Sequence, residues 1–249
     1  MLRKILLGSV AAVSMVTTAN AFVIDTFSDA PMTNDLIGPE DAAAPDQVRT
    51  LLDNETSPGL GDGVAHGSII GGYRDVETTL VEALNSSRHT RSAVDTMSTT
   101  FIHSQDIGVR SHTYITWDGL GSAGLASEDL TDGGISDVFH LVVLAADHDA
   151  TWSLQVDDGD SSFTHVFVNI DPITVATDFY LPFALFTGID MTDVRKIVFG
   201  ANVNDTANLD SEVDFFGTTH IPDVPEPASM TLLGAGLMGL GYMGRRRKA

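Results

Sequence analysis

The stretch TWSLQVDDGDSSFTHVFVNI, residues 151–170, decides the fold class of this chain. Its segments Trp152–Val156 and Phe163–Ile170 each carry large side chains at every second position. Alternation with period 2 is typical of a β-strand that buries one face. The DDGDSS segment between them consists of residues that favour turns by capping their own backbone or by tolerating positive φ. The stretch therefore predicts two short strands joined by a turn.

Similar short runs, separated by Gly, Asp and Asn, fill the chain beyond Gly67. Val138–Ala145 is apolar on both faces, which predicts a strand in the interior of a sheet. Strands spaced at roughly 8–15 residues with turn signals between them are typical of sandwiches. We therefore predict an all-β fold, a single antiparallel β-sandwich of jelly-roll type over residues 22–221. The other predicted strands are Ser68–Tyr73, Val76–Leu84, Val109–Trp117, Phe179–Phe186, Ile197–Val203 and Val213–Phe216.

Helix signals are few. Asp190–Asp193 predicts one capped turn ahead of a strand. Thr78–Asn85 fits either a helix or a strand, and its neighbours favour a strand. Pro31–Gly63 is rich in Pro, Asp, Asn and Gly, which predicts a loop or an irregular arm.

The N-terminal residues 1–21 have the pattern of a secretory signal peptide. Two basic residues precede the apolar segment Ile5–Val16, and Ala19 and Ala21 form a small-x-small cleavage site. The alternative, an N-terminal membrane anchor, requires a longer apolar run. We expect signal peptidase to leave Phe22 as the first mature residue.

The C-terminal residues 222–249 contain a Pro-Glu-Pro triplet, an apolar run and a basic tail, in that order. The apolar run at 228–244 has a length at the lower edge of the ~17–25 residues that a membrane-spanning helix needs. A basic tail after such a span places the preceding chain outside the inner membrane. The triplet and tail residues are Pro225, Glu226, Pro227, Arg245, Arg246, Arg247 and Lys248.

This tripartite tail resembles the PEP-CTERM sorting signal of bacterial surface proteins, which an exosortase reads. The resemblance implies export through the inner membrane of a Gram-negative bacterium and transient anchoring by the helix at 228–244. It also implies sorting to the cell surface or the exopolysaccharide matrix. A lasting tail anchor is the alternative.

The composition narrows the possible functions. The chain has no cysteine, which excludes thiol catalysis, cysteine zinc sites and iron–sulfur clusters. Residues 22–227 hold seven basic and 34 acidic residues, a net charge of −27. Nucleic acid would be repelled by this charge, whereas divalent cations would be attracted. Alternatively, the charge only keeps an extracellular protein soluble.

Three segments carry a second resemblance. The opening FVIDTFSD (22–29), the segment GGYRDVE (71–77) and the closing DFFGT (214–218) look like parts of the galactose-binding-like jelly rolls. The run LPFALFTGIDMTDVRKIVFGANV (181–203) also resembles a stretch of that family. In that fold the first and last of these segments lie near each other, and many members bind sugars.

Two turns are dense in the oxygen ligands that calcium prefers. Neither fits an EF-hand loop, because the glycine after Asp158 comes too early and no glutamate closes the loop. The jelly-roll resemblance also implies a structural calcium near the chain ends. Solvated turn residues are the alternative. The candidate ligands are Asp25, Asp157, Asp158, Asp160, Asp205, Asp210 and Asp214.

A sugar site would need an aromatic ring that stacks on a pyranose. Tyr114, Trp117 and Trp152 are the candidate platforms, and the alternative for both tryptophans is core packing. The candidate polar partners are Arg74, His112 and Asp118.

No hydrolytic motif is present: the eight histidines include no metalloprotease pair, and no G-x-S-x-G elbow occurs. We therefore expect an exported, non-enzymatic protein that is a structural or adhesive component of the envelope or exopolysaccharide matrix. The alternative is a carbohydrate-binding module for matrix or environmental glycans, with calcium as a possible stabiliser. The expected partners are signal peptidase, an exosortase-type enzyme and polysaccharide, but not nucleic acid.

Overall fold

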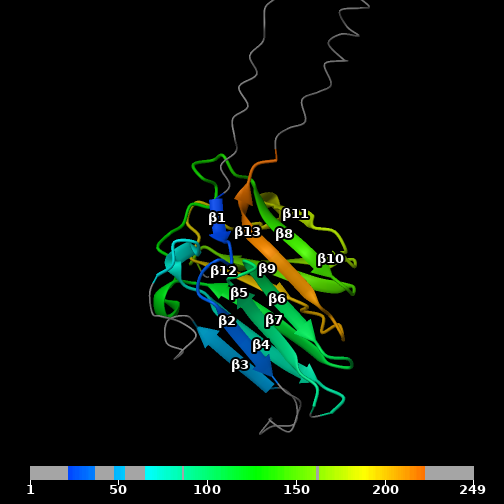
Figure 1. Ribbon diagram of the computed structural model, residues 1–249. Helices are drawn as coiled ribbons and strands as arrows, with labels where there is room; N and C mark the ends of the chain where they lie inside the picture. The colour runs from blue at the N-terminus through cyan, green and yellow to red at the C-terminus, as the bar shows by residue number, and fades with distance from the viewer. Residues whose placement is uncertain (1–21, 37–47, 54–64, 86, 161–162, 222–249) are drawn as a thin grey trace, which may run out of the picture. The chain divides into compact units, whose positions relative to one another are not determined.

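The computed structural model describes residues 22–36, 48–53, 65–85, 87–160 and 163–221. Figure 1 shows the described residues as two layers of β-strands. Within these ranges no helix is long and apolar enough to cross a membrane. The predicted signal peptide (1–21) and the predicted sorting tail (222–249) lie outside the described residues.

Two antiparallel sheets make up the fold. Sheet A has the strand order β11-β8-β13-β6-β5-β2, with β1 paired to β13, and sheet B has the order β10-β9-β12-β7-β4-β3. The strands of sheet A are β1 (Phe22–Asp25), β2 (Met32–Leu36), β5 (Thr90–Asp95), β6 (Thr100–Gln105), β8 (Val138–Ala146), β11 (Thr177–Pro182) and β13 (Ser211–Thr219). The strands of sheet B are β3 (Val48–Asp53), β4 (Asp75–Glu82), β7 (Arg110–Trp117), β9 (Ala150–Asp157), β10 (Phe163–Ile170) and β12 (Lys196–Ala201).

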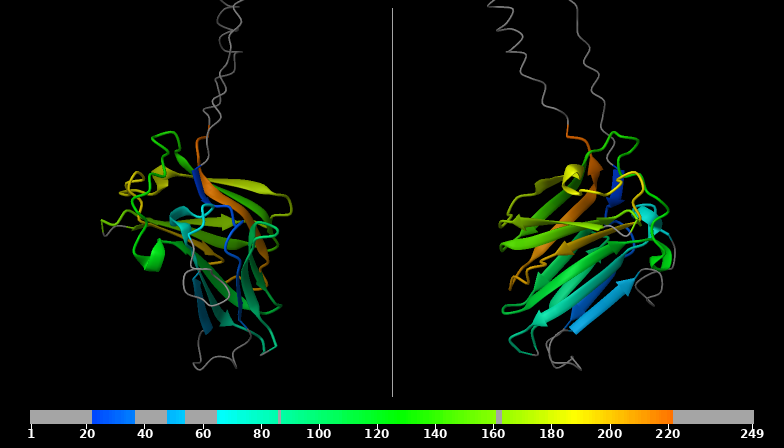
Figure 2. Two further views of the ribbon diagram at one scale, coloured as in Figure 1. Left: turned by 60° about the vertical axis from the view of Figure 1, so that its left-hand side comes forward. Right: turned by 180° about the vertical axis from the view of Figure 1, so that it is seen from behind.

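The chain crosses repeatedly between the layers, so that strands adjacent in sequence often lie in opposite sheets (Figure 2). The inner faces of the two sheets enclose the main hydrophobic core. This confirms the predicted antiparallel β-sandwich. β1 pairs with β13, from Phe22 opposite Thr218, so the first and last strands lie side by side (Figure 1).

Several predicted strands are confirmed and others are wrong. β10 spans Phe163–Ile170 as predicted, and β8 lies between β11 and β13 inside sheet A. The predicted strand Ser68–Tyr73 is instead a 3-10 turn, since Gly71 and Gly72 take φ values of 66° and 81°. The second half of the predicted strand Phe179–Phe186 is also a 3-10 turn. The predicted loop at 31–63 contains β2 and β3.

The strands β5 and β6 were not predicted, because much of their inner face is polar. His103 lies between the sheets, where its Nδ1 is 3.1 Å from Ser92 Oγ and 3.0 Å from Thr113 Oγ1. Ser111 Oγ accepts a 2.9 Å hydrogen bond from the side chain of Gln105. We call this buried hydrogen-bonded set the polar seam: Thr78, Thr90, Ser92, His103, Gln105, Ser111 and Thr113.

The rest of the interior is mainly aromatic and aliphatic. The rings of Trp117 and Phe139 each pack on Phe216, with centroids 5.3 and 5.9 Å apart. Trp152 meets Phe199 edge to face at 5.4 Å. These side chains come from β7, β8, β13, β9 and β12, so the aromatic cluster ties both sheets together.

One ion pair is fully buried inside this core. The carboxylate of Asp25 accepts hydrogen bonds from Arg74 at 2.5 Å, from the Trp117 indole at 2.9 Å and from the Phe27 amide at 2.7 Å. Arg74 also donates to the carbonyl oxygens of Asp29 and Ala30. Burial raises the pKa of Asp25, while the Arg74 charge and these hydrogen bonds oppose that rise. The pair thus fixes β1, the segment before β4 and the end of β7 to one another.

Replacing Arg74 by methionine should lower the free energy of unfolding by about 3–5 kcal/mol, because it leaves the Asp25 carboxylate buried without its counter-charge. Denaturant unfolding measures this. The matched control is Arg195→Met, since the Arg195–Asp193 pair is 44% exposed on both sides and should contribute at most about 1 kcal/mol. Equal losses in the two variants would contradict this account.

The polar seam predicts a pH dependence of stability. Burial, with a smaller contribution from the charge of His112, lowers the pKa of His103 to about 4. The unfolded chain takes up this proton near pH 6.5, so lowering the pH favours unfolding. Between pH 7 and pH 5 the folded state should lose about 2 kcal/mol through this group.

In the His103→Asn variant, the free energy of unfolding should no longer fall by this amount between pH 7 and pH 5. The control His165→Asn, at an exposed position, should show the same fall as the unmodified protein. An NMR titration gives an independent check, since a His103 ring that protonates near pH 6.5 in the folded protein would contradict the assignment.

Candidate functional site

An open groove runs over the outer face of sheet B. It has a volume of about 370 Å³ and a mainly polar lining. Because side chains alternate between the two faces of a strand, the outward positions of β4, β7, β12, β9 and β10 form its floor. The lining residues are Asp75, Glu77, Tyr114, Thr116, Asp118, Gln155, His165, Lys196 and Val198.

The strand register makes this groove cross the sheet rather than follow one strand. His165 lies opposite Gln155, which lies opposite Val198 on the next strand. The same row continues through Thr116 to Asp75 on β4. Four strand spacings separate β10 from β4, or about 19 Å. The groove therefore has the length of a short oligomer rather than of a single small molecule.

The Tyr114 ring lies over a glycine. Tyr114 on β7 is directly opposite Gly200 on β12, and Gly200 is opposite Ser153 on β9. A Cβ on Gly200 would lie 2.8 Å from Cε1 of Tyr114 and 2.5 Å from Ser153 Oγ. Only glycine at position 200 leaves room for the Tyr114 ring. The ring therefore packs directly against the backbone of β12.

Charged groups lie along β7 and its neighbours to either side of Tyr114. Asp118 is buried at 6% exposure and its carboxylate is 3.2 Å from the ammonium of Lys196. On the other flank, His112 Nδ1 is 2.7 Å from the Asp205 carboxylate. Burial, and then the charges of Asp205 and Glu77, raise the pKa of the Tyr114 hydroxyl. The phenol therefore stays protonated and can donate a hydrogen bond.

A row of aromatic side chains flanks one end of the groove on β10. Phe163 and Phe167 are 61% and 63% exposed, and both rings meet His165 edge to face at 5.6 and 5.7 Å. Val166 and Val168 of the same strand pack on the core. The period-2 pattern of this strand was correctly identified from the sequence, but the large aromatic rings lie on its open face.

The tryptophans expected as possible sugar platforms lie elsewhere. Trp117 is 0% exposed and Trp152 is 2% exposed. Both tryptophans therefore pack in the core, and the expectation that they form a sugar-binding platform is wrong. Arg74, expected as a polar partner, is bound to Asp25 in the core. Tyr114 and Asp118 line the groove, and His112 contacts the Tyr114 ring at 5.3 Å.

The candidate calcium ligands are not brought together. Among the described residues no three His, Cys, Asp or Glu side chains cluster as a metal site. Asp157 and Asp158 accept hydrogen bonds from Gly159 and Asp160 in their own turn. Asp210 accepts from Ser104 Oγ, and Asp25 is bound to Arg74. The aspartates thus cap turns and form ion pairs, and Asp214 and Asp205 belong to other local contacts.

Most of the groove residues were not predicted from the sequence. Gln155, His165 and Lys196 are ordinary strand residues whose neighbours are set by register, which no spacing in one strand reveals. The only sequence signal that pointed to the groove was the alternation of large side chains on the exposed face of β10.

Comparison with known families identifies one segment. The PEP-CTERM protein-sorting motif matches residues 223–248, which confirms the resemblance of the tail and indicates export and membrane-anchored sorting. No curated protein matches the chain.

Among solved structures, a variant of a family 29 carbohydrate binding module shares 11% identity over 70% of this chain and 85% of its own, with a TM-score of 0.32. The family 11 carbohydrate-binding module of the cellulosomal cellulase Lic26A-Cel5E of Clostridium thermocellum shares 9% identity over 84% and 99%, with a TM-score of 0.38. An exo-beta-agarase shares 9% identity over 82% of this chain and 26% of its own, with a TM-score of 0.40. Likenesses this low say nothing about a ligand of this chain.

Gly200→Ala should displace the Tyr114 ring and lower the free energy of unfolding by about 1–3 kcal/mol, because the added methyl group overlaps three side chains. Denaturant unfolding and the near-ultraviolet circular dichroism of tyrosine report the two effects. Gly67→Ala is the matched control, since nothing lies within 4 Å of its added Cβ. A Gly200→Ala protein as stable as the control would show that the ring does not occupy this position.

Proposed function

We propose that this exported protein binds polysaccharide, without catalysis, at the cell surface or in the exopolysaccharide matrix. One observation carries the proposal, namely the groove that crosses five strands of sheet B with the Tyr114 ring seated over Gly200. This proposal joins the two functions expected from the sequence, a structural or adhesive component and a carbohydrate-binding module.

The chemistry of the groove supports a glycan. An aromatic ring offers an apolar face to the C–H side of a pyranose, while amides, carboxylates and imidazoles bind its hydroxyls. Gln155 Oε1 lies 2.5 Å from His165 Nε2, so these two side chains already hold each other across β9 and β10. Such fixed polar groups lose little conformational freedom when a ligand binds.

The sorting motif supports the proposed location. We infer that signal peptidase acts after Ala21 and that an exosortase-type enzyme acts at the Pro225–Pro227 triplet. Protein recovered from the surface should then have a mass that begins at Phe22 and ends near the triplet. A mass that retains Arg245–Ala249 would contradict removal of the tail.

Tyr114→Ala should weaken binding to the cell's own polysaccharide about tenfold or more, as expected when a central aromatic contact is removed. Affinity electrophoresis or a pull-down measures the loss. The matched control is Tyr180→Ala, because Tyr180 is 44% exposed on the opposite sheet, where it stacks on His140.

Equal weakening in both variants, or none in either, would rule out the groove as the binding face. The same polysaccharide incubated with the protein should show no new reducing ends. Their appearance would contradict the non-catalytic role.

A further inference from the structure

One terminal strand of the sandwich, β10, contains no charged residue and no proline. Sheet A ends in β11 and β2, and sheet B ends in β10 and β3. Charged residues and prolines on terminal strands hinder pairing with another chain. Each of the other three strands contains such residues, whereas the sequence of β10 is FTHVFVNI. The charged residues and the proline of those three strands are Asp35, Arg49, Asp53, Asp178 and Pro182.

The outer edge of β10 has no partner strand in the described part of the chain. Its backbone pairs only with β9, over Phe163–Ile170. In an antiparallel ladder, every second residue of an edge strand directs its N–H and C=O groups away from the sheet. Phe163 and Phe167 are also 61% and 63% exposed. On the inner side, the Thr164 hydroxyl donates a hydrogen bond to the Thr187 carbonyl at 3.1 Å. The outer edge is therefore suited to the addition of a strand.

An apolar hollow lies between β10 and the terminal strand of sheet A, β11. It has a volume of about 60 Å³, and its lining includes Val168 and Ile170 of β10 and Phe179 and Leu181 of β11. Figure 1 shows both strands on the same side of the molecule. Apolar surface at the ends of both sheets favours association with another molecule on this side.

We propose that two copies of this protein pair through β10, antiparallel and about a two-fold axis, so that their B sheets form one continuous sheet. The axis passes between the two copies of one residue. When this residue is His165, Phe163 of each copy lies opposite Phe167 of the other, and such aromatic pairs stabilise a sheet. Because both copies use the same edge, the pairing closes as a dimer.

The occupant of the edge is a second β10 because of its charge. Two copies of this acidic chain repel each other, so contact through an uncharged strand is the least costly. The nearest acidic residues in the sequence, Asp160 and Asp171, lie outside the segment 163–167 that pairs in this register.

The pairing would join the two candidate grooves end to end. Directly opposite residues of neighbouring strands point to the same face of a sheet. The row from Asp75 to His165 would therefore continue from His165 of the second copy to its Asp75. Ten strands with nine spacings give a row of roughly 43 Å. This step rests on the proposed function, since it requires that glycans bind in the groove.

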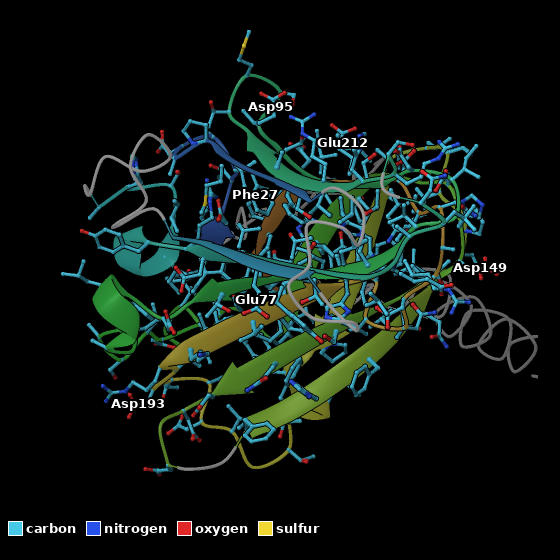
Figure 3. The ribbon with its side chains drawn as sticks, turned by 90° about the horizontal axis from the view of Figure 1, so that it is seen from below. Phe27, Glu77, Asp95, Asp149, Asp193 and Glu212 are labelled. Atoms are coloured by element: carbon cyan, nitrogen blue, oxygen red, sulfur yellow. The ribbon has the colours of Figure 1, made fainter. Side chains whose placement is uncertain are left out.

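Sedimentation velocity of protein recovered from the cell surface tests the pairing without any glycan. The fraction of dimer should rise with protein concentration. Phe167→Lys should raise the dissociation constant of the dimer about tenfold or more, because a charge on the edge opposes strand pairing. The matched control is Met97→Lys, since Met97 is 95% exposed in the turn after β5 and should not affect the dimer. Figure 3 shows Asp95, at the end of β5, on the opposite side of the molecule from β10.

Cross-linking tests the register, because the chain has no cysteine of its own. His165→Cys should be cross-linked between copies by a short bis-maleimide, since directly opposite Cβ atoms lie about 5 Å apart. Met97→Cys should not be. A dimer that is not cross-linked in the His165→Cys variant would overturn the joined groove.

The joined groove also predicts a dependence on glycan length. The cell's own polysaccharide should bind more tightly than fragments of it that fit one groove, because a long chain engages two linked sites. Phe167→Lys should remove this difference and Met97→Lys should keep it. The same difference in both variants would overturn the joined groove.

Failure of the pairing and failure of the proposed function are distinguishable. A monomer at every concentration, or equal dissociation constants for the two lysine variants, would overturn pairing through β10 whatever the protein binds. If the dimer forms as expected but no glycan binds, including the cell's own polysaccharide, the proposed function fails and the pairing stands.

Discussion

The buried contact of Asp25 with Arg74 and the Trp117 indole holds the rest of the structure in place. A carboxylate with no solvent exposure must be paired and hydrogen-bonded, and three donors from separate parts of the chain meet this requirement. The contact joins the first strand of sheet A to the end of β7 in sheet B. β1 also pairs with β13, the last strand of the sandwich. The buried contact therefore links the first and last strands of sheet A to β7 of sheet B.

The position of β7 then determines the groove. Its inner residues belong partly to the polar seam, at Ser111 and Thr113, and partly to the aromatic core, at Trp117. Its outer residue Tyr114 faces the groove. One strand thus supplies the anchor on its buried face and the proposed ligand surface on its open face. The absence of a side chain at Gly200 leaves the space that the Tyr114 ring occupies.

The sequence predicted the all-β sandwich, because alternation and turn residues are local signals. It did not predict β5 and β6, since buried positions such as Ser92 and His103 are polar and hide the hydrophobic period. It also treated both tryptophans as possible surface rings, although their burial depends on cross-sheet packing. The groove could not be predicted for a related reason. The residues from His165 to Asp75 become neighbours only through the register of five strands, which the sequence of one strand does not reveal.

Hydroxyl-radical footprinting of the exported protein, with and without the cell's own polysaccharide, tests the central claim most directly. The central claim is that glycan binds across the outer face of sheet B. The account predicts that polysaccharide protects Tyr114 and His165 from oxidation and leaves Tyr180 on sheet A unchanged. Protection of Tyr180 without protection of Tyr114, or saturating binding that protects neither, would contradict it.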